Sequence, residues 1–314
     1  MPAVVSRGSL LFIWAVLILL FGILRPNTFL TVNTFRSVLA EQAITAVMAL
    51  ALIMPVAANA FDLSIAGSMG ISIVLSTEFM SKTGMGFGAA ALLTLTVGIC
   101  IGAVNAFVIV GLGVNSFIAT LGTNSILVAL MQWISGGNIV TQGIPESFIN
   151  IGRDTLFTIP LFVYYMLIIA ATIWYILDYR KLGRYLYATG SNADAARLAG
   201  VRTRGLTATA LLFSASIATF AGLFFVQRIG AGALDAGTPY LLPAFAAAFL
   251  GATQFKEGNV NVPGTLVAVY VLATGVKGLE LIGAPFWVDD MFNGGALIVA
   301  VALAVRSGRQ RVMA

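Results

Sequence analysis

Histidine is absent from this chain of 314 residues, and cysteine occurs only once, as Cys100. Without histidine the chain lacks the side chain that most often serves as a general base or a metal ligand. A single cysteine can form no disulfide within the chain and has no spacing typical of a metal site. The composition therefore argues against an enzyme and implies no metal or other cofactor. We expect Cys100, which lies in an apolar run, to be a small core residue.

Charged residues are also scarce, at 9% of the chain, whereas 59% of its residues are hydrophobic. Because an ordinary soluble domain has about 25% charged residues, this composition excludes packing in water. Apolar runs recur from Leu10 to Val305 without a polar stretch long enough to form a second domain. We therefore expect an all-α polytopic membrane protein with a single transmembrane domain, residues 1–314.

The chain also lacks the glycine-rich phosphate-binding loop of ATPases, because it contains no Gly-Lys dipeptide. It cannot hydrolyse ATP in that way by itself. If ATP drives its activity, another polypeptide must supply the nucleotide chemistry.

Stretches of about 20 mainly apolar residues predict spanning helices. The second and third stretches are separated only by residues 61–63, and the eighth is short, so we expect broken or partly inserted helices there. A membrane tolerates such breaks only where protein or a water-filled cavity satisfies the backbone. About ten stretches occur, near residues 9–24, 40–60, 64–80, 86–110, 115–135, 157–178, 205–227, 239–252, 261–283 and 287–305.

The net charge of +5 comes from loop residues and does not indicate a nucleic-acid partner. Short loops rich in Lys and Arg remain in the cytoplasm. With Arg7 and the N-terminus inside, eleven basic residues fall on the inner side and five on the outer side. We therefore expect both termini to be cytoplasmic, with the protein in a bacterial inner (plasma) membrane.

A basic loop on the cytoplasmic side, residues 179–204, contains its own helix signals. Asn192 can cap a helix N-terminus, Asp194 suits its first turn, and Gly200 can end it in a left-handed conformation. The seven residues between Asn192 and Gly200 rise only about 10 Å and need a surface to rest on. That surface is either the lipid headgroups or a cytoplasmic partner into which a coupling helix docks.

This loop resembles that of the ribose/xylose/galactose-type permeases, which are subunits of bacterial ABC importers. Asp62-Leu63-Ser64, Asn105 with the later segment 117–122, and Gly264-Thr265-Leu266 follow in the order that this family shows. The resemblance covers nearly the whole chain. In the loop it is carried by Gly183, Arg184, Ala188, Gly190, Asn192, Ala195, Ala196, Leu198 and Gly200.

The sequence departs from the family's pattern in two regions. Before Asp62 the family usually has paired glycines, where this chain has Ala60 and Phe61. Where the family tends to show Tyr-Glu-Leu-Asp, this chain has Tyr240-Leu-Leu-Pro243. Two expected carboxylates are therefore missing near the pathway, so the resemblance does not specify a ribose-like solute.

Polar side chains at membrane depth are costly and suggest functional sites. Asp62 either caps the helix that follows or holds a broken helix in the pathway, and the two roles are compatible. The other polar residues could bind a hydroxylated solute or form ordinary interhelical hydrogen bonds. The aromatic residues could face a sugar or simply lipid and core. The candidate pathway residues are Phe61, Asp62, Ser64, Asn105, Asn115, Phe117, Thr120 and Asn124.

Lys277 and Glu280 are three residues apart, a spacing that allows an ion pair on one helix face. We favour such structural pairing over a proton relay. An ion-coupled secondary transporter remains the alternative function, and Asp62 is its only strong candidate for an ion site.

The resemblance implies three kinds of protein partner besides the lipid membrane itself. Two permease chains, identical or related, would enclose the path of a sugar or similar small polyhydroxylated solute. A cytoplasmic ABC ATPase subunit would supply the energy, and a periplasmic or extracellular solute-binding protein would deliver the solute.

Overall fold

The computed structural model describes residues 9–256 and 258–312, which are almost entirely helical. The one sheet is a short antiparallel pair of strands, β1 and β2. The elements are α1 (Ser9–Leu24), α2 (Pro26–Phe29), α3 (Val32–Ala57), α4 (Ile65–Thr83), α5 (Phe87–Ala106), η1 (Phe107–Gly111), α6 (Ser116–Ser135), α7 (Glu146–Arg153), β1 (Thr155–Leu156), β2 (Ile159–Pro160), α8 (Leu161–Tyr179), α9 (Lys181–Ser191), α10 (Ala193–Leu198), α11 (Thr203–Ile229), α12 (Thr238–Gly251), α13 (Val262–Leu281) and α14 (Trp287–Val312).

Each of the ten apolar stretches coincides with one helix, but the structure supports fewer spans than ten. In the part of the chain that the structure describes, six helices are long and apolar enough to cross a membrane, and α1 and α12 are shorter apolar helices. The protein is therefore an all-α polytopic membrane protein, and the count of about ten stays a prediction. Arg7 lies outside the described residues. The six candidates are α3, α5 with η1, α6, α8, α11 and α13.

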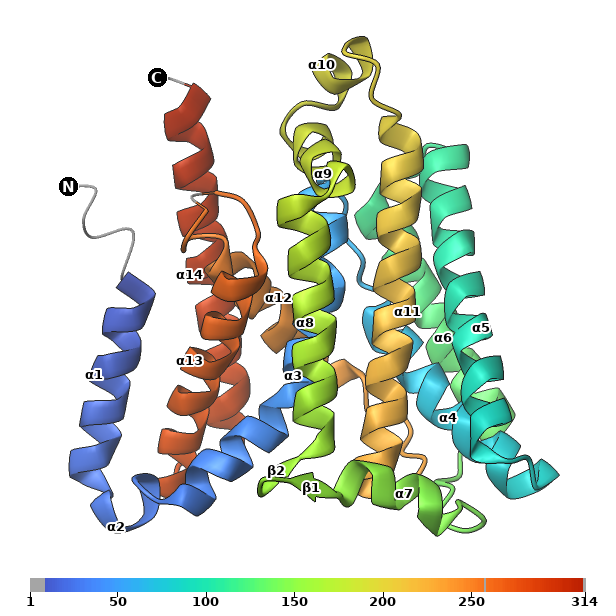
Figure 1. Cartoon of the computed structure of the whole chain (residues 1–314), viewed down its shortest axis with the longest axis vertical. Coiled ribbons are helices and arrows are strands. Elements are labelled where there is room, and N and C mark those ends of the chain that lie inside the picture. The colour runs from blue at the N-terminus through green and yellow to red at the C-terminus, as the bar shows by residue number, and fades with distance from the viewer. Residues whose placement is uncertain (1–8, 257, 313–314) are drawn as a thin grey trace. The chain divides into compact units, whose positions relative to one another are not determined.

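The chain divides into two compact units, and the first comprises the described residues up to Ile53 and from Leu242 onward. Within it α1 packs along α13, as Figure 1 shows. The Trp14 indole N–H donates to Thr274 Oγ1 at 2.8 Å and fixes this contact. The predicted pair is confirmed, because Lys277 Nζ lies 2.9 Å from a Glu280 carboxylate oxygen.

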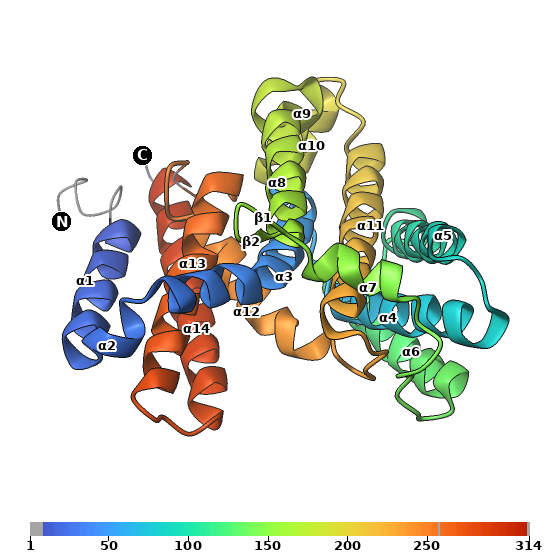
Figure 2. The same ribbon diagram turned by 60° about the horizontal axis from the view of Figure 1, so that its bottom comes forward.

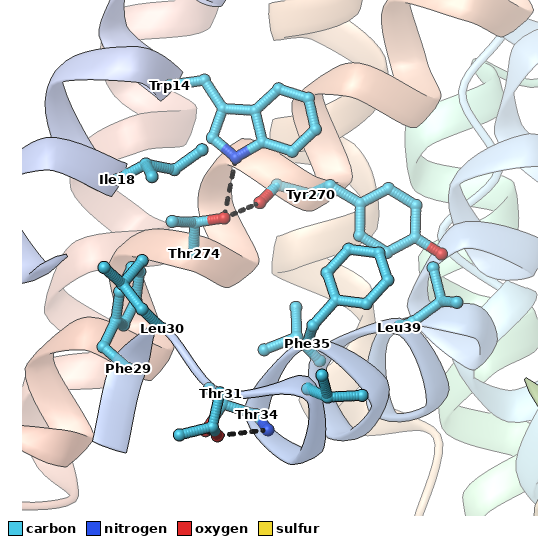
Figure 3. A pocket seen from close by; sticks show the side chains of 12 residues that line it. Trp14, Ile18, Phe29, Leu30, Thr31, Thr34, Phe35, Leu39, Tyr270 and Thr274 are labelled. Atoms are coloured by element: carbon cyan, nitrogen blue, oxygen red, sulfur yellow. Dashed lines mark hydrogen bonds between the residues drawn. The ribbon is translucent and has the colours of Figure 1, made fainter. Parts of the chain in front are cut away.

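An apolar pocket of about 540 Å³ lies within this first unit. Figure 3 shows the side chains of Trp14, Phe29 and Phe35 around it, with Tyr270 and Thr274 on the far wall. The Thr274 hydroxyl already donates to the Tyr270 carbonyl at 2.7 Å. Because hydrocarbon groups form nearly all of the lining, the pocket offers little to a polyhydroxylated solute.

The second unit, Met54–Leu241, is built around α4, whose residues from Ile65 to Glu78 are all buried. α5, α6 and α11 surround α4, and α11 also packs along α5 (Figures 1 and 2). Small residues allow the close approach of helices that is typical of membrane bundles. A Cβ atom built at Gly102 of α5 would lie 2.8 Å from the Leu212 Cα of α11.

The two ends of α8 carry different structures. α7, β1 and β2 lie at one end of α8, and α9 and α10 lie at the other (Figure 1). The contact between α8 and α9 is close, because a Cβ atom at Gly183 would lie 2.2 Å from the Leu177 carbonyl oxygen.

The expectation that Cys100 is a core residue is wrong, because Cys100 is exposed on α5. The apolar run around it predicts burial in hydrocarbon, which the lipid can provide as well as the protein interior. α5 packs toward α11 through the face that carries Gly98 and Gly102, and Cys100 lies on another face.

The close packing of α5 on α11 generates a testable prediction. Gly102→Ala places a methyl group against backbone and should lower the stability of the purified protein by about 1–3 kcal/mol. Gly122→Ala in α6 is the matched control, because nothing lies within 4 Å of a Cβ atom there. Thermal unfolding in detergent measures both, and equal unfolding temperatures would contradict the packing account.

Candidate functional site

The helical chain is interrupted between α3 and α4, and the interruption carries the candidate pathway residues. α3 ends at Ala57, and Asn59 adopts a left-handed backbone conformation with φ of 56°. The backbone groups released by this break are satisfied by α6. Phe61 N–H donates to the Ser116 hydroxyl, and Leu63 N–H donates to Thr120 Oγ1, both at 3.0 Å. The break therefore meets the requirement for internal hydrogen bonding in a membrane.

Asp62 organises a buried polar network at this break. Its Oδ1 accepts hydrogen bonds from the backbone N–H and the hydroxyl of Ser64, at 3.0 and 2.5 Å. Asn105 Nδ2 in turn donates to the Ser64 hydroxyl at 2.8 Å, and Thr123 Oγ1 donates to Asn105 Oδ1 at 2.7 Å. Asp62, Ser64 and Asn105 have no exposed surface. The network therefore joins the start of α4 to α5 and α6.

Asp62 lies two residues before the N-cap position of α4, so it does not cap the helix in the predicted way. α4 begins at Ile65, its N-cap residue is Ser64, and the Ser64 side chain makes no capping hydrogen bond. The Asp62 carboxylate instead accepts the N–H of Ser64 itself, within the turn that leads into the helix.

The second carboxylate oxygen of Asp62 is free to accept a hydrogen bond. Asp62 Oδ2 is buried and has no hydrogen-bond partner among the described residues, and the same holds for the Ser214 hydroxyl of α11. Ser214 is nonetheless close enough to interact with Asp62. A small rearrangement could therefore close a contact between the break and α11.

The candidate residues of α6 differ in their surroundings. Thr120 is fully buried at the break, and Asn124 Oδ1 accepts the N–H of Gly67 at 2.7 Å. Asn115 is exposed and caps α6 by accepting the N–H of Phe117 at 2.9 Å. Phe117 is itself 50% exposed. Thr120 and Asn124 thus bind backbone N–H groups of the break and of α4, next to the network of Asp62, Ser64 and Asn105. Asn115 and Phe117 lie at the exposed start of α6.

Ser116 and Thr123 belong to this site, although the sequence analysis did not select them. Ser116 directly follows the capping Asn115, and Thr123 lies one helical turn after Thr120 on the same helix. The spacing of three residues from Thr120 could therefore have indicated that Thr123 lies on the same face of α6. The partners of both residues lie far away in sequence and could not be inferred from it.

The basic loop contains one helix that the sequence analysis expected and one that it did not. α10 is confirmed as a short helix, with the Asn192 side chain accepting the N–H of Ala195 at 2.9 Å. Gly200 takes the expected left-handed conformation, with φ of 85°. The preceding helix α9 was not predicted, although Gly183, Leu186 and Thr189 form one buried face at helical spacing.

Gly190 connects this loop to the break. A Cβ atom at Gly190 would lie 2.2 Å from the Ala57 carbonyl oxygen and 3.2 Å from the backbone nitrogen of Asn59. Only a residue without a side chain allows α9 to lie this close to the chain that leads to Asp62. The loop therefore contacts the chain at Ala57 and Asn59, where α3 ends and three residues before Asp62.

Exposure distinguishes the residues of the loop that could meet a partner. Arg184, Ala188 and Ala195 are exposed, but Ala196 is buried within the chain itself, at 6% exposure. Leu198 is 89% exposed and was not selected as a contact residue. Leu198 and Ala195 are therefore better candidates than Ala196 for a docking contact, because a charge at Ala196 would disturb the loop itself.

The Asp62 network predicts a difference between two substitutions. Asp62→Asn keeps an acceptor oxygen for Ser64 and should leave stability nearly unchanged. Asp62→Leu leaves a buried N–H and a hydroxyl without partners and should cost about 1–3 kcal/mol for each group. Thermal unfolding of the purified variants measures this, and a loss for Asn as large as for Leu would show that the charge, not the hydrogen bonding, stabilises the break.

Comparison with known proteins assigns this arrangement to a family. The family described as branched-chain amino acid transport system / permease component matches residues 34–301. No solved structure matches the chain.

Curated relatives match at nearly full length. The D-allose transport system permease protein of Escherichia coli (strain K12) is 28% identical over 292 residues, 93% of this chain and 89% of the relative. The ribose import permease protein of the same strain is 28% identical, and the match covers 91% of this chain and 89% of the relative. The autoinducer 2 import system permease protein of Photorhabdus laumondii is also 28% identical, and the match covers 90% of this chain and 86% of the relative.

The family match covers more than half of the chain and includes the break, the polar network and the basic loop. The protein therefore belongs to the branched-chain amino acid transport system / permease component family, and it is the permease subunit of an ABC importer.

Proposed function

We propose that this permease carries a sugar or a similar small polyhydroxylated solute into the cell. The observation that carries the proposal is the hydroxyl- and amide-rich network at the break, where Phe61 lies in the break and Phe117 in the first turn of α6. Such groups suit a solute with many hydroxyls and little charge. The relatives named for allose, ribose and autoinducer 2 support the same class. The proposed pathway residues are Phe61, Asp62, Ser64, Asn105, Asn115, Phe117, Thr120 and Asn124.

The proposal does not specify ribose. Tyr240-Leu-Leu-Pro243, which forms part of α12, has no carboxylate where the resembling family has two. A solute that relies on those carboxylates would lose charged hydrogen bonds, which are worth about 1.5–3 kcal/mol each. The solute of this permease therefore makes its contacts mainly with uncharged groups.

An ion-coupled mechanism has less support. It needs a carboxylate at membrane depth that is free to bind and release an ion. One oxygen of Asp62 accepts the hydrogen bonds of Ser64 at the start of α4, so an ion that bound to this carboxylate and left it again would disturb the break. Lys277 and Glu280 already neutralise each other.

The proposed architecture is one permease domain, residues 1–314, with about ten spans and both termini in the cytoplasm of a bacterial cell. Support comes from the ten apolar stretches, all of which are helical, and from the excess of Lys and Arg on one side. In this proposal the ten spans are the six candidate helices together with four more, α1, α4, α12 and α14. Of these, α4 is less apolar because it is rich in serine and glycine, and it is shielded by its neighbours.

The loop of α9 and α10 is the proposed docking site for a separate cytoplasmic ATPase. An exposed leucine on a six-residue helix, Leu198, is costly in water and suits a protein surface. The Gly190 contact would carry a displacement of the docked loop directly to the break. The proposed coupling residues are Gly183, Arg184, Ala188, Gly190, Asn192, Ala195, Ala196 and Gly200, to which we add Leu198.

Two further partners complete the proposed importer. A second permease chain, identical or related, would form the other wall of the pathway, and a binding protein would deliver the solute from outside. Permeases of this kind work with both an ATPase and a binding protein.

The proposed orientation predicts the sides from which two positions can be labelled. In a Cys100→Ala background, Leu198→Cys should react with an impermeant thiol reagent only from the cytoplasmic side. Gln142→Cys, exposed between α6 and α7, should react only from outside. Labelling of both positions from the same side would contradict the ten-span topology.

The docking proposal predicts that Leu198→Glu prevents ATPase binding. The variant should lose co-purification with the ATPase encoded beside its gene and should lose ATP-dependent sugar uptake in reconstituted vesicles. Loss of an anchoring side chain costs about 2 kcal/mol or more, which is roughly a thirtyfold loss of affinity. Leu156→Glu is the matched control, because this exposed leucine lies at the opposite end of α8.

A third variant separates a protein partner from the lipid surface. Leu198→Lys should also abolish coupling if the ATPase receives this leucine. If α10 instead rests on anionic headgroups, lysine should be tolerated and glutamate should not. Normal coupling in both Leu198 variants would refute the docking site.

A further inference from the structure

A polar cavity of about 550 Å³ lies in the second unit, where α9 meets α10. Its lining comes from four parts of the chain: the break, the end of η1, the junction of α9 and α10, and the start of α11. Ala58 and Val110 supply apolar surface, and Asn59, Ser191, Thr203 and Arg204 supply polar groups. The volume is within the range of about 300–1,000 Å³ that is usual for small-molecule sites.

The cavity carries a single charge, which is positive. Arg204 is the only charged residue among those that line it, and among the described residues no ion pair involves Arg204. The nearest carboxylate along the chain, that of Asp194, is bound to Arg197 at 2.9 Å. The cavity is therefore complementary to an anion.

The polar groups beside Arg204 are also without partners within the described part of the chain. The side chains of Asn59, Ser191 and Thr203 form no hydrogen bonds there, whereas the Thr207 hydroxyl is already occupied by the Thr203 carbonyl. An amide and two hydroxyls beside a guanidinium can bind a phosphate group and sugar hydroxyls together. A simple inorganic anion would contact only some of these polar groups and would fill only part of the cavity.

We propose that this cavity binds a phosphate monoester of a sugar on the cytoplasmic side and that its occupation inhibits import. The inference rests on the proposed function and orientation. Phosphorylation would add about two negative charges to the same polyhydroxylated body that the permease admits. The cavity thus recognises a modified, cytoplasmic form of the transported class, which is distinct from the neutral solute.

Inhibition follows from the position of the cavity. A ligand bound to both Asn59 and Arg204 bridges the break and the start of α11, and Ser191 adds the end of α9. Of these elements, the end of α9 and the break are the two that the Gly190 contact joins, between the coupling loop and Asp62. A ligand that fixes them in one arrangement stabilises that arrangement by its binding free energy and so opposes transport.

The first test is direct binding of glucose 6-phosphate to the purified full chain in lipid nanodiscs, by calorimetry. Arg204→Gln should weaken binding at least tenfold, as expected for loss of a charged hydrogen bond. Arg202→Gln is the matched control, because this exposed arginine is two residues away and does not line the cavity. Glucose and inorganic phosphate, tested separately, should each bind at least tenfold more weakly than the ester.

The second test uses vesicles reconstituted with the ATPase and binding protein. Glucose 6-phosphate on the cytoplasmic side should slow ATP-driven uptake by the unmodified protein and by Arg202→Gln, but not by Arg204→Gln. Uptake without the ester tests the proposed function separately, so the failure of one proposal is distinct from the failure of the other.

Three results would overturn the inference. One is no binding, or equal binding by the two arginine variants. Another is equal affinity for inorganic phosphate and the ester, which would leave an anion site without sugar recognition. The third is loss of ATPase co-purification in Arg204→Gln alone, which would assign the cavity to the docking surface of the ATPase.

Discussion

The structure depends on one constraint: inside a membrane, every backbone N–H and C=O group must find its partner within the protein. An unbroken helix meets this requirement by itself, but the chain between α3 and α4 does not. Ser116 and Thr120 of α6 supply the missing partners through their hydroxyls, and Asp62 holds the turn that restarts the helix. The polar residues at membrane depth are therefore first of all what makes an irregular segment possible there.

The same segment is confined on its other side by the loop helices. α9 approaches the backbone of Ala57 and Asn59 so closely that only glycine fits at position 190. Hydrogen bonds hold the break to α6 on one side. On the other side the contact at Gly190 holds it against α9. A displacement of either element must move the break or lose contacts, because tightly packed interfaces do not deform continuously.

Local chemistry was predictable from the sequence, and burial was not. The Asn192 cap, the left-handed Gly200 and the Lys277 pair depend on neighbours within a few residues, and all three are present. Cys100 was assigned incorrectly, and the burial of Ala196 was not predicted, because the face that a helix presents to the protein depends on distant elements. The partners of Asp62 and Asn105 lie on other helices, so the sequence could suggest their importance but not their connection.

Most hydrogen-bonding groups of this network are occupied, although Asp62 Oδ2 is not, and this bears on how a solute would pass the proposed pathway. Ser64, Asn105 and Thr120 use their hydrogen-bonding groups on one another or on the break, so a solute that bound them would first have to displace these bonds. The exchange of one set of hydrogen bonds for another yields little net free energy. The proposed pathway would therefore hold its solute weakly, which favours rapid release, and its selectivity would come mainly from the proposed solute-binding protein.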